Sequence, residues 1–189
     1  IDTMGARDTG WIQIYSEDCQ EAYDNFIQAF RIGEHPDVLT PVMVGFDGFI
    51  ISHSAEVVQV EDDDAVKKFI GEFKPPFPLL DTSRNFTVGP IDFTDYYFEH
   101  KRSQIAGIEN SPRVIEEVGK EFGKTFGRPY GFFEEYRMDD AELAIVVMSS
   151  AAGTCKDAVD ELRAEGKKIG LLKPRVFRPF PHIQIAEAL

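Results

Sequence analysis

The chain has 189 residues, with 20 Lys and Arg against 33 Asp and Glu, and therefore a net charge of −13 at pH 7. This acidic balance excludes nucleic acid and anionic membrane surfaces as main partners, because phosphate contacts need clustered basic side chains. A hydrophobic content of 43% is typical of globular proteins, and two cysteines, Cys19 and Cys155, are too few for a disulfide framework and indicate a reducing compartment.

The first fifty residues predict a strand, a helix and a second strand. Residues 11–15 alternate in the manner of a strand, and residues 41–46 form a short apolar run that is typical of a covered strand. Between them, residues 18–33 predict an amphipathic helix that starts at an acidic cap and turns Phe26 and Phe30 to the core. This order of elements favours two parallel strands in one sheet.

The middle of the chain is less regular. Residues 57–60 predict a short edge strand, and 62–70 predict a helix. Residues 74–90 contain four prolines and predict an ordered, extended connection whose apolar side chains pack on other structure. The helical pattern of residues 95–126 is interrupted by Pro112, so two helices and one kinked helix both fit. Its expected buried positions are Ile105, Ile108, Ile115, Val118 and Phe122.

A second α/β unit is expected after about residue 139. It begins with a buried apolar strand, and a turn of small residues at 149–154 leads into a helix that Gly166 ends. With the strand-like segment that precedes it, the predicted strands are 132–136, 143–148 and 168–172, and the predicted helices are 155–165 and 183–189.

The two ends of the chain point to a longer protein. No apolar run approaches the ~20 residues of a membrane span. Ile1 opens an acidic stretch rather than a basic one, so no signal peptide is expected. The chain starts without Met and stops inside a helical pattern at Leu189, and we therefore expect a piece of something longer.

The turn before the first strand holds the first candidate site residue. Arg7 lies among small residues in the segment Gly5–Gly10, where its guanidinium is able to project into a cleft and hold a carboxylate in bidentate fashion. The competing interpretation is an ordinary ion pair with Asp8.

A second candidate follows the second strand. The carboxyl ends of strands line the ligand crevice of open α/β sheets, and Asp47 and His53 come directly after such an end. The competing interpretation is a turn in which Asp47 and Ser52 bond local backbone groups. A metal site is not expected, because the four histidines are scattered along the chain.

Several segments, in order over nearly the whole chain, carry a family resemblance. They are Met4–Tyr15, Gln20–Tyr23, Pro41–Val44, Asp47–His53, Tyr130–Gly131, Glu134–Arg137, Gly170–Lys173 and Arg175–Pro181. Together they resemble the α subunit of pyruvate:ferredoxin oxidoreductase (pyruvate synthase) and related 2-oxoacid:ferredoxin oxidoreductases. Each motif is short, and the resemblance rests on their common order.

This resemblance implies an α/β fold with three parts. Residues 1–73 resemble the later half of the pyrimidine-binding domain of a thiamine-diphosphate enzyme, which is built on a parallel sheet. Residues 74–138 form a proline-rich connection and helices. Residues 139–189 resemble the start of a domain like the transketolase C-terminal domain.

The resemblance also implies an activity and roles for site residues. The family decarboxylates pyruvate or a similar 2-oxoacid oxidatively on thiamine diphosphate, passes electrons through [4Fe–4S] clusters to ferredoxin, and forms an acyl-CoA. The arginine that matches Arg7 contacts the substrate carboxylate, so Arg7 is the expected catalytic contact. Asp8 and Thr9 shape its loop, and Asp47 and His53 support the crevice. No acid–base role is assigned, because the cofactor carries the chemistry.

Departures from the family pattern limit what the chain is expected to do alone. It lacks the segment with the cofactor-activating glutamate, the Gly-Asp-Gly…Asn motif for Mg²⁺ and diphosphate, and the cluster cysteines. Thiamine diphosphate and Mg²⁺ are therefore expected in the whole complex and the clusters on other subunits or domains, with none on this chain alone. The isolated chain is expected to be an inactive part of a cytoplasmic, multisubunit enzyme whose partners are its other subunits, ferredoxin and coenzyme A.

Two other functions stay open. One is a non-catalytic α/β domain that docks partner subunits through apolar side chains such as Phe77, Phe177 and Phe180. The other is a stand-alone domain that binds an anion at residues 149–154. Within the enzyme interpretation, pyruvate is the default substrate by resemblance, and oxalate, 2-oxoglutarate and branched-chain acids are alternatives.

Overall fold

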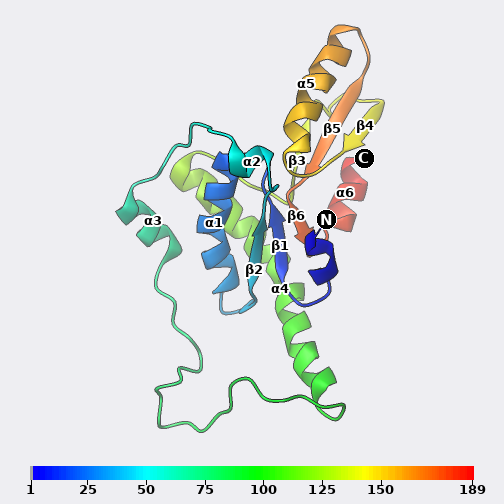
Figure 1. Cartoon of the computed structure of the whole chain (residues 1–189). Coiled ribbons are helices and arrows are strands. Elements are labelled where there is room, and N and C mark those ends of the chain that lie inside the picture. Colours follow the sequence, from blue (N-terminus) through cyan, green and yellow to red (C-terminus); the bar gives the residue numbers. More distant parts are fainter. Residues whose placement is uncertain (1) are drawn as a thin grey trace.

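The computed structural model describes residues 2–189 and contains two three-stranded sheets, ordered β2–β1–β6 and β3–β5–β4 (Figure 1). The strands are β1 (Ile12–Tyr15), β2 (Val42–Gly45), β3 (Phe133–Tyr136), β4 (Leu143–Val146), β5 (Ile169–Pro174) and β6 (Val176–Arg178). The helices are η1 (Asp2–Ala6), α1 (Cys19–Gly33), α2 (Ile50–His53), α3 (Asp63–Ile70), α4 (Tyr97–Phe126), α5 (Ala151–Ala164) and α6 (His182–Ala188).

The first sheet contains the strand pair that the sequence predicts. β1 and β2 are parallel, in the register Ile12↔Val42 to Tyr15↔Gly45, with α1 as the crossover between them. The helix starts at the predicted acidic cap, where the Asp18 carboxylate accepts a hydrogen bond from the Glu21 amide. β6 adds an antiparallel strand on the other side of β1, so the sheet is mixed.

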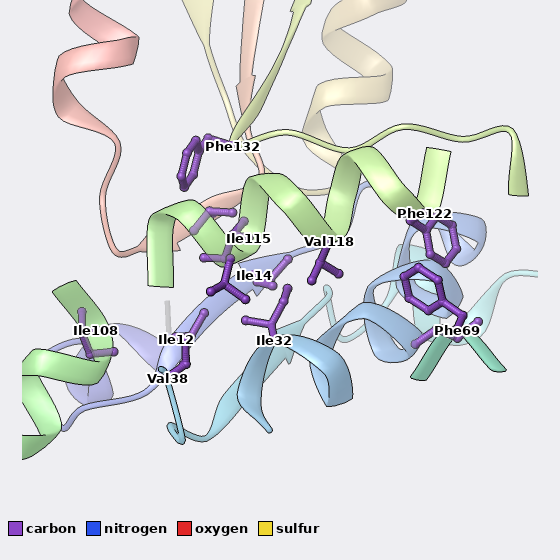
Figure 2. Close-up of a cluster of buried hydrophobic side chains, with 13 residues drawn as sticks. Ile12, Ile14, Ile32, Val38, Phe69, Ile108, Ile115, Val118, Phe122 and Phe132 are labelled. Atoms are coloured by element: carbon purple, nitrogen blue, oxygen red, sulfur yellow. The ribbon is translucent and has the colours of Figure 1, made fainter. Parts of the chain in front are cut away.

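The main core lies on one face of this sheet. Ile12 and Ile14 of β1 are fully buried there, and side chains of both α1 and α4 pack over them (Figure 2). The cluster contains Ile12, Ile14, Ile27, Ile32, Val38, Phe69, Ile108, Val114, Ile115, Val118, Phe122, Phe132 and Val176. Burial of these apolar side chains holds the two helices against the strands.

α4 is one continuous helix of 30 residues despite Pro112. A proline has no N–H and leaves the carbonyl four residues earlier without its helical donor. Here the Ser111 hydroxyl donates to the Ile108 carbonyl at 2.8 Å, so this buried oxygen keeps a partner. The structure therefore decides between the two expectations for residues 95–126 in favour of a single helix.

The second sheet carries α5 on one side (Figure 1). β4 runs parallel to β5, and β3 runs antiparallel to it. The prediction of a buried strand at 143–148 is wrong for the described residues, because Leu143 is 69% and Val146 is 50% exposed. β4 lies at the end of the strand order, so among residues 2–189 it pairs on one side only, with β5.

Three other expectations are wrong, and one predicted helix starts earlier than expected. Residues 57–60 form no strand, and the helix predicted at 155–165 begins earlier, at Ala151. The connection at 74–90 is extended, but most of its apolar side chains are exposed, Leu80 by 94% for example, and Phe86 is partly buried against Phe77 of the same segment. Ile105, an expected core position of α4, is half exposed.

The prediction that α1 turns its apolar face to the core is wrong for two of its aromatic residues. Phe26 and Phe30 are 50% and 55% exposed, although helical spacing predicts them in the core. The helix instead buries a polar stripe that includes Asp24, Asn25 and Gln28. Charged groups from the far end of the chain meet this stripe, as described below. No helix among residues 2–189 is both long and apolar enough to cross a membrane.

Candidate functional site

The turn at residues 7–10 leads from η1 into β1 and holds three of the predicted site residues. The Arg7 side chain is 62% exposed, and its Nε donates to the Asp8 carboxylate at 3.0 Å. Both partners are open to solvent, so this pair stabilises the fold little and is easily exchanged for another anion. Arg7 thus makes the expected pair with Asp8 while most of its guanidinium donors stay accessible.

The backbone of this turn is anchored to α4. The Thr9 hydroxyl donates to the Ala6 carbonyl at 2.6 Å, and the Thr9 carbonyl accepts a hydrogen bond from Lys101 at 3.3 Å. Gly10 has φ +99°, and a Cβ at this position would lie 2.0 Å from Cδ of Gln104. Only glycine fits both the backbone angle and the close approach of the α4 side chain.

Asp47 and His53 lie around the short helix α2, which follows β2. One Asp47 oxygen accepts the amides of Phe49 and Ile51, each at 3.0 Å, so its carboxylate holds the start of this helix. The exposed His53 ring stacks on Phe49, and its Nδ1 lies 2.7 Å from the Ser52 hydroxyl. The local, turn-bonding interpretation of Asp47 is therefore present in the structure.

Hydrogen bonding also sets the acidity of Asp47. Desolvation raises the pKa of this carboxyl, but hydrogen bonds from Ser150 and from the amides of Phe49, Ile50 and Ile51 outweigh it and hold the pKa below its usual range. Asp47 is therefore an anion at neutral pH and accepts hydrogen bonds rather than donating them.

The predicted site residues fall into two groups at opposite ends of the parallel strand pair. The turn with Arg7 enters β1 at its amino end, whereas Asp47 follows β2 at its carboxyl end. Instead, the carboxyl end gathers loops from distant parts of the chain. Ser149, which follows β4, donates its hydroxyl to the carbonyl of Ser16, which follows β1, at 3.0 Å.

A buried ionic cluster behind this carboxyl end is absent from the sequence-based prediction. The Lys173 side chain is only 7% exposed, and its Nζ contacts carboxylates of Glu17 at 2.7 Å, Glu134 at 2.9 Å and Glu21 at 3.1 Å. Desolvation lowers the pKa of Lys173, but these three carboxylates outweigh it and raise the pKa well above its ordinary value. Lys156 adds a second cation between Glu17 and Glu134.

Arg175 continues this cluster beneath α1. It is 2% exposed, and its guanidinium donates to Asn25 at 2.6 Å and to the Gly131 carbonyl at 2.9 Å. Because its near hydrogen-bond acceptors are neutral, desolvation dominates and lowers the pKa of Arg175 to about 10. The signal in the sequence was a polar stripe at helical spacing in residues 21–28, which resembles a solvated helix face unless its basic partners are known.

Comparison with known families identifies the chain. A family model described as pyruvate flavodoxin/ferredoxin oxidoreductase, thiamine diP-bdg, matches residues 1–120. The chain belongs to this family. A second model, pyruvate:ferredoxin oxidoreductase core domain II, matches residues 141–189. These matches confirm the resemblance and the expected α/β class with a thiamine-diphosphate-binding part.

Curated relatives in this oxidoreductase family align over the whole chain. Pyruvate synthase subunit PorA of Thermotoga maritima is 55% identical over 188 residues, which are 100% of this chain and 48% of that protein. The Methanocaldococcus jannaschii subunit of the same name is 44% identical over 100% of this chain and 49% of its own length. The α subunit of NADH-dependent phenylglyoxylate dehydrogenase from Aromatoleum evansii is 41% identical over 100% of this chain and 47% of its own. The chain thus spans about half the length of these relatives.

The [4Fe–4S] clusters that the family resemblance implies do not find their ligands in this chain by itself. A [4Fe–4S] cluster takes four cysteine thiolates, and the sequence contains two cysteines. Residues 2–189 include no group of three or more His, Cys, Asp or Glu side chains able to hold a metal ion.

Proposed function

We propose that the chain is part of a 2-oxoacid:ferredoxin oxidoreductase, which decarboxylates pyruvate or a similar 2-oxoacid oxidatively on thiamine diphosphate, reduces ferredoxin and forms an acyl-CoA. The observation that carries the proposal is the family match over residues 1–120, which includes the turn with Arg7. Relatives named as pyruvate synthase subunits favour pyruvate, and the phenylglyoxylate relative keeps a larger 2-oxoacid as an alternative.

In this proposal Arg7 binds the carboxylate of the 2-oxoacid. A guanidinium presents a planar pair of donors that matches a carboxylate, and it stays charged at any working pH. The exposed Asp8 pair holds the side chain out from the turn until the substrate carboxylate replaces it. Thr9 and the contact with Lys101 keep the turn in place, so that the reacting bond of the substrate is oriented while the cofactor supplies the chemistry.

The remaining parts of the enzyme are proposed to come from outside residues 1–189. These are the Mg²⁺ and diphosphate ligands, the cluster cysteines, and the binding surfaces for ferredoxin and coenzyme A. Asp47 and His53 support the crevice at the other end of the strand pair. Free thiols at Cys19 and Cys155 fit a cytoplasmic location.

We also propose a division of the chain into three parts. Residues 1–73 form the later half of the pyrimidine-binding domain, residues 74–138 a connection and helices, and residues 139–189 the start of the next domain. The spans of the two family models, 1–120 and 141–189, support a boundary at the start of the third part, near residue 139. The long irregular segment before α4 supports the other boundary, near residue 73.

The experiment is steady-state kinetics of the reconstituted multisubunit enzyme with Arg7→Ala and Arg7→Lys. We expect Arg7→Ala to lower kcat/KM for the oxoacid at least tenfold, about 1.4 kcal/mol of transition-state binding, while Arg7→Lys recovers part of the loss. Asp8→Asn separates the ion pair from the guanidinium, because it removes the observed partner of Arg7 and leaves the guanidinium in place. Unchanged kinetics in Arg7→Ala would remove Arg7 from the substrate site.

A second candidate function is a non-catalytic domain that docks other subunits. What favours it is exposed apolar surface outside the Arg7 turn: Phe77 is 61% and Phe180 44% exposed. Under this alternative, charge reversal at these positions weakens assembly, and Arg7→Ala leaves the kinetics of the assembled enzyme unchanged. Size-exclusion mass together with the kinetics above separates the two candidates.

A further inference from the structure

η1, the short helix at the N label in Figure 1, leads into the turn with Arg7. It has five residues, Asp2–Ala6, and none of them is buried. A 3₁₀-helix of this length has poor hydrogen-bond geometry and buries little apolar surface, so it is not stable by itself. The position of η1, and with it the entry into the turn, therefore depends on contacts with neighbouring elements.

Two polar side chains of β1 hold η1 at a single residue, Thr3. The Tyr15 hydroxyl shares a hydrogen bond with the Thr3 hydroxyl, and the Gln13 amide donates from Nε2 to the Thr3 carbonyl at 3.3 Å. Ile12 and Ile14 of the same strand are buried in the main core, so Gln13 and Tyr15 point to the opposite face of the sheet. η1 therefore lies on the face of β1 opposite the core.

The Tyr15 ring is fixed by the strands on both sides of it. On β2, Gly45 pairs in register with Tyr15, and a Cβ at Gly45 would lie 2.8 Å from Cδ1 and Cε1 of the ring. The ring thus occupies space that only a glycine leaves open. On β6, Phe177 meets the ring edge to face, with the two centroids 6.2 Å apart. Because the ring is held on two sides, its hydroxyl has a defined position from which it bonds Thr3.

Gln13 is a costly residue for its position unless its amide is bonded. Its side chain is fully buried. Burying an amide without hydrogen bonds costs free energy, and an apolar side chain at this strand position avoids that cost. Within residues 2–189 the Gln13 side chain makes one hydrogen bond, and this bond goes to η1. The polar residue is therefore explained by its contact with Thr3 and not by the packing of the sheet.

Backbone hydrogen bonds continue this anchor from Thr3 to Arg7. The Arg7 amide donates to the Met4 carbonyl at 3.3 Å, and the Thr9 amide donates to the Ala6 carbonyl at 3.1 Å. A 3₁₀-helix rises ~2.0 Å per residue, so the four steps from Thr3 to Arg7 span roughly 8 Å. α4 holds the other end of the turn through the Thr9 carbonyl. Arg7 therefore lies between two anchored points of the backbone.

We propose that Gln13 and Tyr15 are positioning residues for the substrate-binding arginine. Through Thr3 they hold η1 on the sheet, and η1 holds the Arg7 guanidinium where it meets the carboxylate of the 2-oxoacid. Neither residue touches the substrate in this arrangement. The inference rests on the proposed function, because it takes Arg7 as the carboxylate contact. A displacement of about 1 Å is enough to weaken an oriented contact strongly, so the anchor of this backbone matters for the reaction.

The test is a double-mutant cycle in the reconstituted multisubunit enzyme, with Tyr15→Phe and Gln13→Leu each placed on the wild-type and the Arg7→Ala background. Both substitutions nearly keep the volume of the side chain and remove its bond to Thr3. We expect each to lower kcat/KM for the oxoacid roughly fivefold when Arg7 is present, and to have less than about a twofold effect when Arg7 is alanine. Thr3→Val removes the same hydroxyl pair from the other side, so we expect it to match Tyr15→Phe, and both together to cost no more than either alone.

Tyr136→Phe is the matched control. Tyr136 also donates its hydroxyl, to Asp160 at 2.7 Å, but it lies on β3 in the second sheet. Its substitution is expected to leave kcat/KM unchanged on both backgrounds. Amide hydrogen exchange of the same assembled enzymes, measured on peptides from residues 4–10, reports the structure of the turn. We expect faster exchange there in Tyr15→Phe and Gln13→Leu than in wild type and Tyr136→Phe.

Each result supports or overturns the inference. Faster exchange together with a loss of kcat/KM that requires Arg7 supports it. Equal losses on both backgrounds show that Gln13 and Tyr15 act on the fold in general, and wild-type exchange shows that η1 stays in place without them; both results overturn it. Wild-type kinetics in Tyr15→Phe and Gln13→Leu beside a loss in Arg7→Ala overturn the inference alone. Wild-type kinetics in Arg7→Ala overturn the proposed function, and the inference with it.

Discussion

Asp24 and Arg128 pair across 104 residues of chain, with Nε and Nη2 of the guanidinium donating to the two carboxylate oxygens at 2.6 and 2.9 Å. The Asp24 side chain is fully buried, and Tyr130 also donates its hydroxyl to it at 2.6 Å. Desolvation and the negative charge of Asp24 raise the pKa of this Tyr130 phenol, which therefore stays protonated as a donor. The pair joins α1 to the segment that leads into the second sheet, and so connects the two sheets of the molecule.

Asp24→Asn is expected to destabilise the chain strongly. The substitution keeps the shape of the side chain but leaves Arg128, which is 22% exposed, with Glu61 as its remaining carboxylate partner. Removing one member of a largely buried ion pair costs roughly 3 kcal/mol of unfolding free energy. Urea unfolding followed by circular dichroism measures the change.

Asp64→Asn is the matched control for this prediction. Asp64 pairs with Lys67 at 3.6 Å on the surface of α3, and both side chains are largely exposed. We expect no measurable shift of the urea midpoint, because exposed pairs stabilise little. Equal midpoints for Asp24→Asn and Asp64→Asn would show that the buried pair does not hold the fold together.

Lys173→Met is expected to make stability depend on pH in a new way. In the wild type, desolvation raises the pKa of Glu21 above 4.5 despite the charge of Lys173, so its contribution to stability is present below pH 4.5 and is lost as pH rises through the raised pKa. Desolvation also acts on Glu134, but hydrogen bonds and charge from Lys156 and Lys173 lower its pKa, so its contribution is present above pH 4.5 and is lost on acidification.

Removing the Lys173 ammonium takes away an attraction that lowers both carboxyl pKa values. The pKa values of Glu21 and Glu134 therefore rise in the folded variant. Above pH 4.5 the folded variant then binds more protons than its unfolded chain, so its stability decreases as the pH increases. We expect the loss relative to wild type to grow from pH 5 to pH 8 and to reach roughly 3 kcal/mol at the upper end. Thermal and urea unfolding at pH 5, 6.5 and 8 measure it.

Lys167→Met is the control for that series. Lys167 is 56% exposed, and within residues 2–189 its ammonium pairs with one carboxylate, that of Glu165. Its substitution is expected to leave the unfolding midpoint nearly constant across the same pH values. A pH-independent loss in Lys173→Met would mean that packing of the lysine stem, and not its charge, stabilises the cluster.

The sequence predicts the elements of this fold better than it predicts what covers them. Local signals are sufficient for the strand–helix–strand unit, for the cap at Asp18 and for the stop at Gly166, because caps, turns and periodicity act over a few residues. β6 is missed because it has three residues next to a proline and forms only by pairing with β1. Its existence depends on a contact between distant segments.

The burial of α1 fails for a related reason. Helical spacing marks both an apolar and a polar stripe on this helix, and the apolar one normally faces the core. Here the polar stripe meets Lys173 and Arg175, about 150 residues away, and the apolar stripe with Phe26 and Phe30 lines an open apolar groove between α1 and β2. No pattern within residues 18–33 shows which stripe finds its partners in this part of the protein.

The site residues are affected in a similar way. The sequence suggests Arg7 and Asp47 as site residues, but only the pairing of β1 with β2 places them at opposite ends of these strands.

Gly119→Ala is expected to destabilise the packing of α4. A Cβ on Gly119 would lie 2.0 Å from the carbonyl oxygen of Tyr130, which is backbone and has little room to move. The segment at residues 129–131 must then shift from the helix, at a cost on the order of 2 kcal/mol that outweighs the gain in helix propensity. Chemical denaturation of the isolated chain measures the loss.

Gly5→Ala provides the comparison for Gly119→Ala. A Cβ on Gly5 meets nothing within 4 Å, and its φ lies outside the left-handed region. We expect stability equal to or slightly above the wild type, because alanine reduces the entropy of the unfolded chain. Similar losses in both variants would indicate a general cost of replacing glycine, rather than the close approach of α4 to Tyr130.

Gly10→Ala tests whether α4 positions the turn that carries Arg7. The left-handed φ of +99° disfavours alanine, and the new Cβ would overlap the Gln104 side chain, which also bonds Lys101. In the reconstituted enzyme we expect roughly a tenfold lower kcat/KM for the oxoacid, because displacement of the turn moves Arg7 away from the carboxylate. The double variant Gly10→Ala/Gln104→Ala relieves the overlap but not the backbone strain, so it is expected to recover part of the activity. Recovery by the double variant separates the steric contact from the strain, whereas wild-type kinetics in Gly10→Ala would show that the turn needs no support from α4.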